Sequence, residues 1–166
     1  MSPLLYREMT GILPAETLVS LGEVASLCFR IPGQPVPSPT RCADQLDLAL
    51  RGFRWVHLGL AYDGERVVGY KVGRSNDPRT FESWNGGVLP RARRRGVGAE
   101  LARRQEAWCR EQGFAYLSTE TASDNRAMLI LNLRQGFYVA GTYLDRGKNM
   151  KVVLQKALNT EPECTG

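Results

Sequence analysis

The sequence lacks several features that would assign it to particular classes of protein. No apolar run approaches the roughly 18 residues of a membrane span, since the longest pieces are short ones such as LGLAY and MLIL. It has one histidine, His57, and its four cysteines contain no CxxC pair, so neither a zinc site nor a disulfide framework is expected. It also has no internal repeat and no low-complexity segment. These absences exclude helical membrane proteins, small disulfide-rich proteins and repeat proteins.

What is present is typical of an ordinary globular domain. The chain has 166 residues, of which 43% are hydrophobic and 23% are charged. A chain of about this length buries enough surface to hold a core without disulfides or metals. We therefore expect one domain over residues 1–158 and a frayed tail over 159–166. In the N-terminal stretch MSPLLYREM, Arg7 and Glu8 interrupt any signal-peptide core, and with unpaired thiols this predicts a cytoplasmic protein.

The basic charge is concentrated in one place. Lys and Arg number 22 against 17 Asp and Glu, which gives a net charge of +5. Four of the arginines, Arg91 and Arg93 to Arg95, stand within five consecutive positions of the stretch VLPRARRRGVGAEL. Such a local excess suggests an anionic partner.

Hydrophobic periodicity predicts a mixed α/β domain. Helical spacing of apolar residues favours helices, whereas alternating runs bounded by turn residues favour strands, as in the hairpin at Asp63-Gly64. The pair Gly86-Gly87 inside a strand predicts a bulge or a close approach of another backbone. Helices are expected over 14–29, 40–52, 96–112 and 125–135, and strands over 4–9, 55–62, 66–73, 81–89, 114–121, 136–144 and 149–158.

The stretch from residue 88 to 101 has the chemistry of a phosphate cradle. A strand ends at Leu89-Pro90, and the residues from Gly96 to Ala99 open a helix. The first amides of a helix lack partners within the helix, and the helix dipole makes that end positive. Glycine removes the Cβ that would keep a phosphate away from those amides, and arginine adds charge-assisted hydrogen bonds.

Two familiar phosphate motifs do not fit this stretch. A P-loop needs a lysine that is absent after Gly98, and a dinucleotide fingerprint needs a third glycine where Leu101 stands. A solvated basic run in front of a helix remains an alternative interpretation for the arginines alone.

Together with the segments on its C-terminal side, the stretch resembles the GNAT superfamily of acyl-CoA-dependent N-acetyltransferases. The family signature Arg/Gln-x-x-Gly-x-Gly/Ala after a strand is matched by Arg93, Gly96 and Gly98. A strand comes next, then the helix NRAMLILNLRQGF, which is led by Asn125 and ends at Gly136-Phe137. The resemblance implies a single-domain α/β (α+β) fold, with a mixed, mostly antiparallel sheet splayed at its centre and about four helices.

The resemblance also implies how acetyl-CoA would be held. Backbone groups of Val88 and Leu89 would pair with the pantetheine arm, and amides from Arg94 to Ala99 would hold the pyrophosphate. Asn132 stands where many relatives have a tyrosine that protonates the departing thiolate, and asparagine cannot supply that proton. The implied cofactor-binding residues are Val88, Leu89, Arg93, Arg94, Arg95, Gly96, Val97, Gly98, Ala99, Asn125 and Asn132.

The catalytic residues are less narrowly specified. The backbone N–H of Val88 is the candidate donor to the developing oxyanion. Glu82 and Glu120 are candidate general bases, because an alkyl ammonium must lose its proton before it can attack. His57 and a chain of water molecules stay open as alternatives.

The expected function is direct transfer of an acetyl group from acetyl-CoA to a primary amine of a small molecule or peptide, without a metal. A catalytically idle acyl-CoA-binding module is the alternative, motivated by Asn132 and the uncertain base. A nucleic-acid module built on the arginine cluster is a weaker alternative, because no aromatic residues are interleaved with it. The resemblance allows a homodimer, and the sequence does not identify the acceptor.

Overall fold

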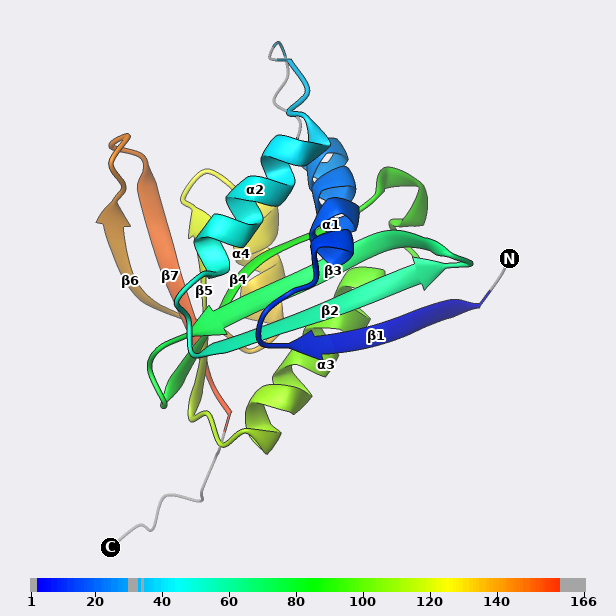
Figure 1. Cartoon of the computed structure of the whole chain (residues 1–166). Coiled ribbons are helices and arrows are strands. Elements are labelled where there is room, and N and C mark those ends of the chain that lie inside the picture. The colour runs from blue at the N-terminus through cyan, green and yellow to red at the C-terminus, as the bar shows by residue number, and fades with distance from the viewer. Residues whose placement is uncertain (1–2, 30–32, 34, 159–166) are drawn as a thin grey trace, which may run out of the picture. The chain divides into compact units, whose positions relative to one another are not determined.

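The computed structural model describes residues 3–29, 33 and 35–158 (Figure 1). The predicted helices and strands are confirmed, and all of their ends fall within two residues of the predicted ones. A short 3-10 helix, η1, was not predicted. The elements are β1 (Leu4–Thr10), α1 (Ala15–Cys28), α2 (Pro39–Leu50), β2 (Trp55–Asp63), β3 (Arg66–Ser75), β4 (Thr80–Val88), η1 (Pro90–Ala92), α3 (Val97–Glu111), β5 (Tyr116–Ala122), α4 (Arg126–Arg134), β6 (Tyr138–Leu144) and β7 (Met150–Ala157).

Hydrogen bonds join the strands in the order β1-β2-β3-β4-β5-β7-β6. The pair β4–β5 is parallel, and the pairs β1–β2, β2–β3, β5–β7 and β6–β7 are antiparallel. The predicted mixed, mostly antiparallel sheet with four α-helices is therefore confirmed for the described part of the chain. Within that part, every helix is too short or too polar to cross a membrane.

The chain forms two compact units. Unit 1 comprises Met1–Asn76 and Asn85–Gln105, and unit 2 comprises Asp77–Trp84 and Glu106–Gly166. Both β4 and α3 contribute residues to each unit. One domain over residues 1–158 stays a prediction, and the predicted frayed tail lies outside the described residues.

In unit 1 both faces of the β2–β3 hairpin are covered. Helix α1 packs against β3 and α2, and a Cβ at Gly22 of α1 would overlap the carbonyl oxygen of Pro39. On the other face, Leu101 of α3 lies against Gly59 of β2. Because both faces are covered, β2 is buried continuously from Val56 to Ala61 and reads as an apolar run rather than as an alternation.

In unit 2 an aromatic cluster fixes the start of β4. The ring of Phe81 lies 5.1 Å from that of Trp108 and 5.2 Å from that of Phe114, in edge-on or tilted geometry. Beside it, the residues from Thr80 to Glu82 pair with β5. This ladder occupies the first third of β4, as expected for a sheet that splays between these strands.

Candidate functional site

The predicted phosphate cradle is a tight turn that leads into α3. After β4, η1 carries the chain to Arg93, and Arg94 and Gly96 then adopt left-handed φ angles of 62° and 77°. The first hydrogen bond of α3 runs from the Glu100 N–H to the Gly96 carbonyl at 3.0 Å. The N–H groups of the first turn precede this bond, and such amides have no partner inside the helix. A left-handed turn beside a helix start forms a concavity that suits an anion.

The space around Gly98 indicates whether this turn fits a diphosphate. A Cβ at Gly98 would meet only Val88 Cγ2 within 4 Å, at 3.8 Å, which is an ordinary van der Waals distance. The residue is exposed and lies in the first turn of α3, where alanine is a better helix former than glycine. Packing within the described residues therefore does not require glycine here. A ligand that approaches the backbone closely would require it.

The three predicted arginines differ in their surroundings. The Nε of Arg93 donates to the carbonyl of Val88 at 3.1 Å, and Arg95 forms an ion pair of 2.7 Å with Asp63. Arg94 is exposed. Sequence reasoning did not foresee that two of the three side chains hold the protein's own groups. The Arg95 contact ties the β2–β3 hairpin to the cradle.

The predicted close approach at Gly86-Gly87 is confirmed. A Cβ at Gly86 would lie 2.9 Å from the carbonyl oxygen of Tyr70, and one at Gly87 would lie 3.0 Å from the Sγ of Cys28. The end of β4 is therefore pressed against β3 and α1, directly before Val88, whose N–H is the predicted oxyanion donor.

In unit 2 the two candidate bases lie on the same face of the sheet. The register pairs Glu82 with Ser118, which stands two residues before Glu120 on β5. Paired residues of adjacent strands point to the same face, and so do residues two apart on one strand. Glu82 is half-buried and Glu120 is exposed.

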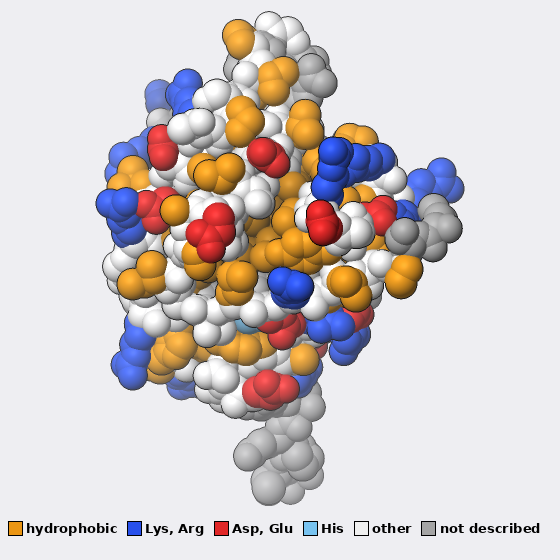
Figure 2. Space-filling model, turned by 45° about the vertical axis from the view of Figure 1, so that its right-hand side comes forward, with side chains coloured by type: hydrophobic (Ala, Val, Ile, Leu, Met, Phe, Trp, Pro, Cys, Tyr) orange, Lys and Arg blue, Asp and Glu red, His pale blue; other side chains and the backbone are white. Residues whose placement is uncertain are grey.

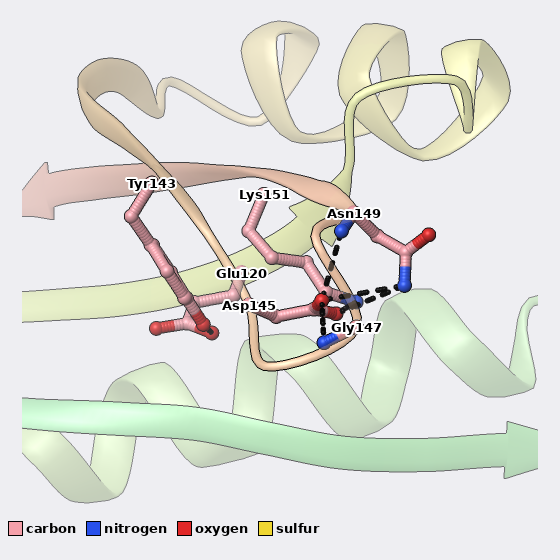
Figure 3. Close-up of polar contacts among 6 residues, drawn as sticks. All are labelled: Glu120, Tyr143, Asp145, Gly147, Asn149 and Lys151. Atoms are coloured by element: carbon pink, nitrogen blue, oxygen red, sulfur yellow. Dashed lines mark hydrogen bonds and ion pairs between the residues drawn. The ribbon is translucent and has the colours of Figure 1, made fainter.

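Tyr143 on β6 joins this pair of carboxylates, and sequence reasoning missed it. Its hydroxyl donates to Oε2 of Glu120 at 2.6 Å (Figure 3). This hydrogen bond is the main cause that raises the pKa of Tyr143 to about 12, and the negative charges of Glu120, Asp145 and Glu82 add to it. No local pattern in the sequence marks this contact, because it depends on which strands are neighbours in the sheet.

Asp145 orders the turn that comes after Tyr143. Its Oδ1 accepts the backbone N–H groups of Gly147 and Asn149, both at 2.9 Å, as Figure 3 shows. The hydrogen bonds from Asn149 are the largest favourable cause that lowers the pKa of Asp145. Lys151 approaches the same carboxylate at 3.9 Å. The turn between β6 and β7 is thus held by one side chain.

The remaining predicted residues have structural surroundings of their own. The side chain of Asn125 caps α4 by accepting the Met128 N–H at 3.3 Å. Asn132 is buried near the end of the same helix. His57 has no exposed surface, and burial lowers its pKa to about 4. An acceptor cannot reach it, so His57 drops out as a candidate base.

The described residues contain no group of three or more His, Cys, Asp or Glu side chains that could hold a metal ion. The structure brings together Glu82 and Glu120 in unit 2, and Val88 with the cradle in unit 1. Asn125 caps α4 and Asn132 lies on it, both in unit 2.

Comparison with known proteins gives a consistent result. A sequence model described as the acetyltransferase (GNAT) family matches residues 18–137. A search of curated proteins finds no match. The ribosomal-protein-S18-alanine N-acetyltransferase of Escherichia coli superimposes with a TM-score of 0.72 at 13% identity, covering 96% of this chain and 99% of that one. A GNAT family acetyltransferase of Elizabethkingia anophelis, solved with acetyl-CoA bound, gives 0.64 at 15% identity, covering 93% and 97%.

Proposed function

Because this chain belongs to the acetyltransferase (GNAT) family, we propose that it is an acetyl-CoA-dependent N-acetyltransferase. In this proposal it moves the acetyl group directly to a primary amine of a small molecule or peptide. Gly98 carries the assignment of the cofactor site, since a glycine that packing does not require stands at an open helix start.

The cradle residues are proposed to hold the diphosphate of acetyl-CoA. The N–H groups from Arg94 to Ala99 would donate to it, and the exposed Arg94 would add its charge. The N–H of Val88 would donate to the carbonyl oxygen of the thioester. Bound acetyl-CoA supplies an activated acetyl group whose thiol, with a pKa near 8.5, leaves readily as the thiolate. The loss of the usual tyrosine at Asn132 is therefore tolerable.

Glu120 is proposed as the group that takes the proton from the acceptor amine, with Glu82 as the second candidate. Exposure favours Glu120, because an incoming amine can reach its carboxylate. Tyr143 is proposed as a positioning residue, since its hydroxyl fixes one carboxylate oxygen of Glu120. The other oxygen is then available to accept a proton.

Thermal melting with and without acetyl-CoA tests the proposed cofactor site. A ligand present at 100 times its dissociation constant stabilises the fold by about 2.7 kcal/mol, whereas Gly98→Leu should show none of this gain. Gln112→Leu is the matched control, because it adds the same side chain to an exposed position just beyond the far end of α3. An undiminished gain in Gly98→Leu would overturn the cradle.

A free-thiol assay over a panel of amines tests turnover. The proposal expects release of coenzyme A that depends on the amine. Stabilisation by acetyl-CoA without release of thiol for any amine would instead favour an acyl-CoA-binding module without catalysis.

A further inference from the structure

Unit 1 contains a cavity of about 630 Å³ outside the cradle. It lies between α1, the tip of the β2–β3 hairpin and the start of η1. Its size falls within the roughly 300–1,000 Å³ of sites that hold drug-sized ligands. The residues that line it are Ser20, Glu23, Leu27, Tyr62, Glu65, Arg66, Val67, Leu89, Pro90 and Arg91.

A bulge builds the wall of this cavity on the side of the hairpin. The β2–β3 register shifts after Ala61, so that Tyr62 pairs with Val67 and one residue of β3 is left over. A bulge of this kind redirects side chains, and both Tyr62 and Val67 line the cavity. Leu27 from α1 and Leu89 complete an apolar lining.

Two acidic and two basic side chains surround this apolar lining. Glu23 and Glu65 are acidic, Arg66 and Arg91 are basic, and all four are exposed. In the described part of the chain none of them belongs to an ion pair. Figure 2 shows a hollow of apolar side chains in this face of the molecule, with acidic and basic side chains around it.

This charge pattern separates the cavity from the cradle. Two carboxylates oppose a polyanion such as coenzyme A, and of the residues implied for acetyl-CoA only Leu89 lines the cavity. A ligand that satisfies both signs carries a carboxylate for the guanidinium groups and an ammonium for the carboxylates. Its body must be apolar to match Leu27, Tyr62 and Leu89.

We propose that this cavity is a binding site for a short peptide that has free termini and bulky apolar side chains. The apolar side chains fill the lining, while the termini meet the charges around it. Ser20 donates its hydroxyl hydrogen to the Glu16 carbonyl, so its oxygen remains able to accept a peptide N–H. The proposal does not depend on the proposed acetyl transfer, and its tests use no acetyl-CoA as donor.

Titration calorimetry with the tripeptide Leu-Tyr-Leu tests the site. The form with free termini should bind, and the form acetylated at its N-terminus and amidated at its C-terminus should bind at least about tenfold more weakly, because it has lost both charges. Ser20→Trp, which fills the cavity, should weaken the free peptide by a similar factor. The control Val19→Trp places the same side chain on the exposed neighbouring position of α1 and should change nothing.

A second variant avoids any change in the helix. Arg66→Glu, at the exposed hairpin tip, should weaken the free peptide about tenfold and leave the capped peptide unchanged. Melting temperatures show whether each variant is folded. The proposal is overturned if the free peptide does not bind at millimolar concentration, if Ser20→Trp binds it normally while folded, or if coenzyme A competes for the cavity.

Discussion

The two proposed sites, one in each unit, are built from different kinds of groups. The cradle of unit 1 consists of backbone N–H groups, and all of its residues stand within the short stretch from Val88 to Ala99. The proposed base site of unit 2 consists of side chains. Its residues Glu82, Glu120 and Tyr143 come from three different strands. A turn followed by a helix start can be recognised in sequence because it is local. A group of side chains assembled by a sheet cannot, because strand order decides which residues meet.

The same contrast appears in the titratable groups. In unit 1 burial alone lowers the pKa of His57 to about 4. In unit 2 a hydrogen bond and neighbouring charges raise the pKa of the exposed Tyr143 to about 12. The first group reports on the core, and the second reports on the proposed site. Variants that affect binding, stability or turnover separately can test this division.

The largest effect is expected at Glu120. Glu120→Gln keeps the shape of the side chain and removes the base, so kcat should fall about 10²- to 10⁴-fold. The stabilisation by acetyl-CoA should remain, because the cradle lies in unit 1. The free-thiol assay measures the first quantity and thermal melting the second.

Two further variants provide the control and the comparison for Glu120→Gln. Glu111→Gln, at the exposed end of α3, is the matched control and should leave kcat unchanged. Glu82→Gln compares the two candidate bases directly. A loss smaller than tenfold in both Glu82→Gln and Glu120→Gln would remove the carboxylates from the mechanism and favour water as the base.

The second prediction concerns how the stability of the fold changes with pH through His57 in the core of unit 1. The pKa of His57 is depressed from 6.5 in the unfolded chain to about 4 in the fold, so the unfolded state binds more protons between these values. Its contribution to stability is complete above pH 6.5 and is lost as the pH falls toward 4. The full loss is on the order of 3 kcal/mol, from about 1.36 kcal/mol per pKa unit.

The measurement is the free energy of unfolding between pH 4 and pH 7, compared with that of His57→Leu. The difference between the two proteins should track this loss, because the other groups are common to both. NMR titration of the imidazole gives a second reading. A midpoint near 6.5 in the folded protein would contradict the effect of burial.

The helices, the strands and the turn that forms the proposed cradle could be predicted from sequence because their signals are local. Asp63-Gly64 marks the hairpin, and Gly96 marks the turn before α3. Tyr143 could not be predicted, since its contact with Glu120 spans 23 residues and requires β7 to pair with both β5 and β6. The need for Gly22 was equally hidden, because it depends on how α2 packs on α1. The sequence shows a glycine without showing what approaches it.

Gly22 and Gly98 illustrate the difference between a glycine that the fold requires and one that it does not. Gly22→Ala places a Cβ on the Pro39 carbonyl oxygen and 3.0 Å from the Cβ of Ala43, so it should lower the free energy of unfolding by about 1–3 kcal/mol. Gly98→Ala meets no such obstacle, and it should raise stability by roughly 0.5–1 kcal/mol through its better helix propensity. Chemical denaturation without ligand measures both. A loss of stability in Gly98→Ala would show that the fold itself needs this glycine.

The smallest effect is expected at Tyr143. Tyr143→Phe keeps the ring and removes the hydrogen bond to Glu120, so kcat should fall less than roughly tenfold while the KM for acetyl-CoA stays unchanged. A residue that serves only the packing of β6 would leave kcat unchanged. The same variant should also lose the absorbance change of a phenol that ionises near pH 12, which identifies the titration as that of Tyr143.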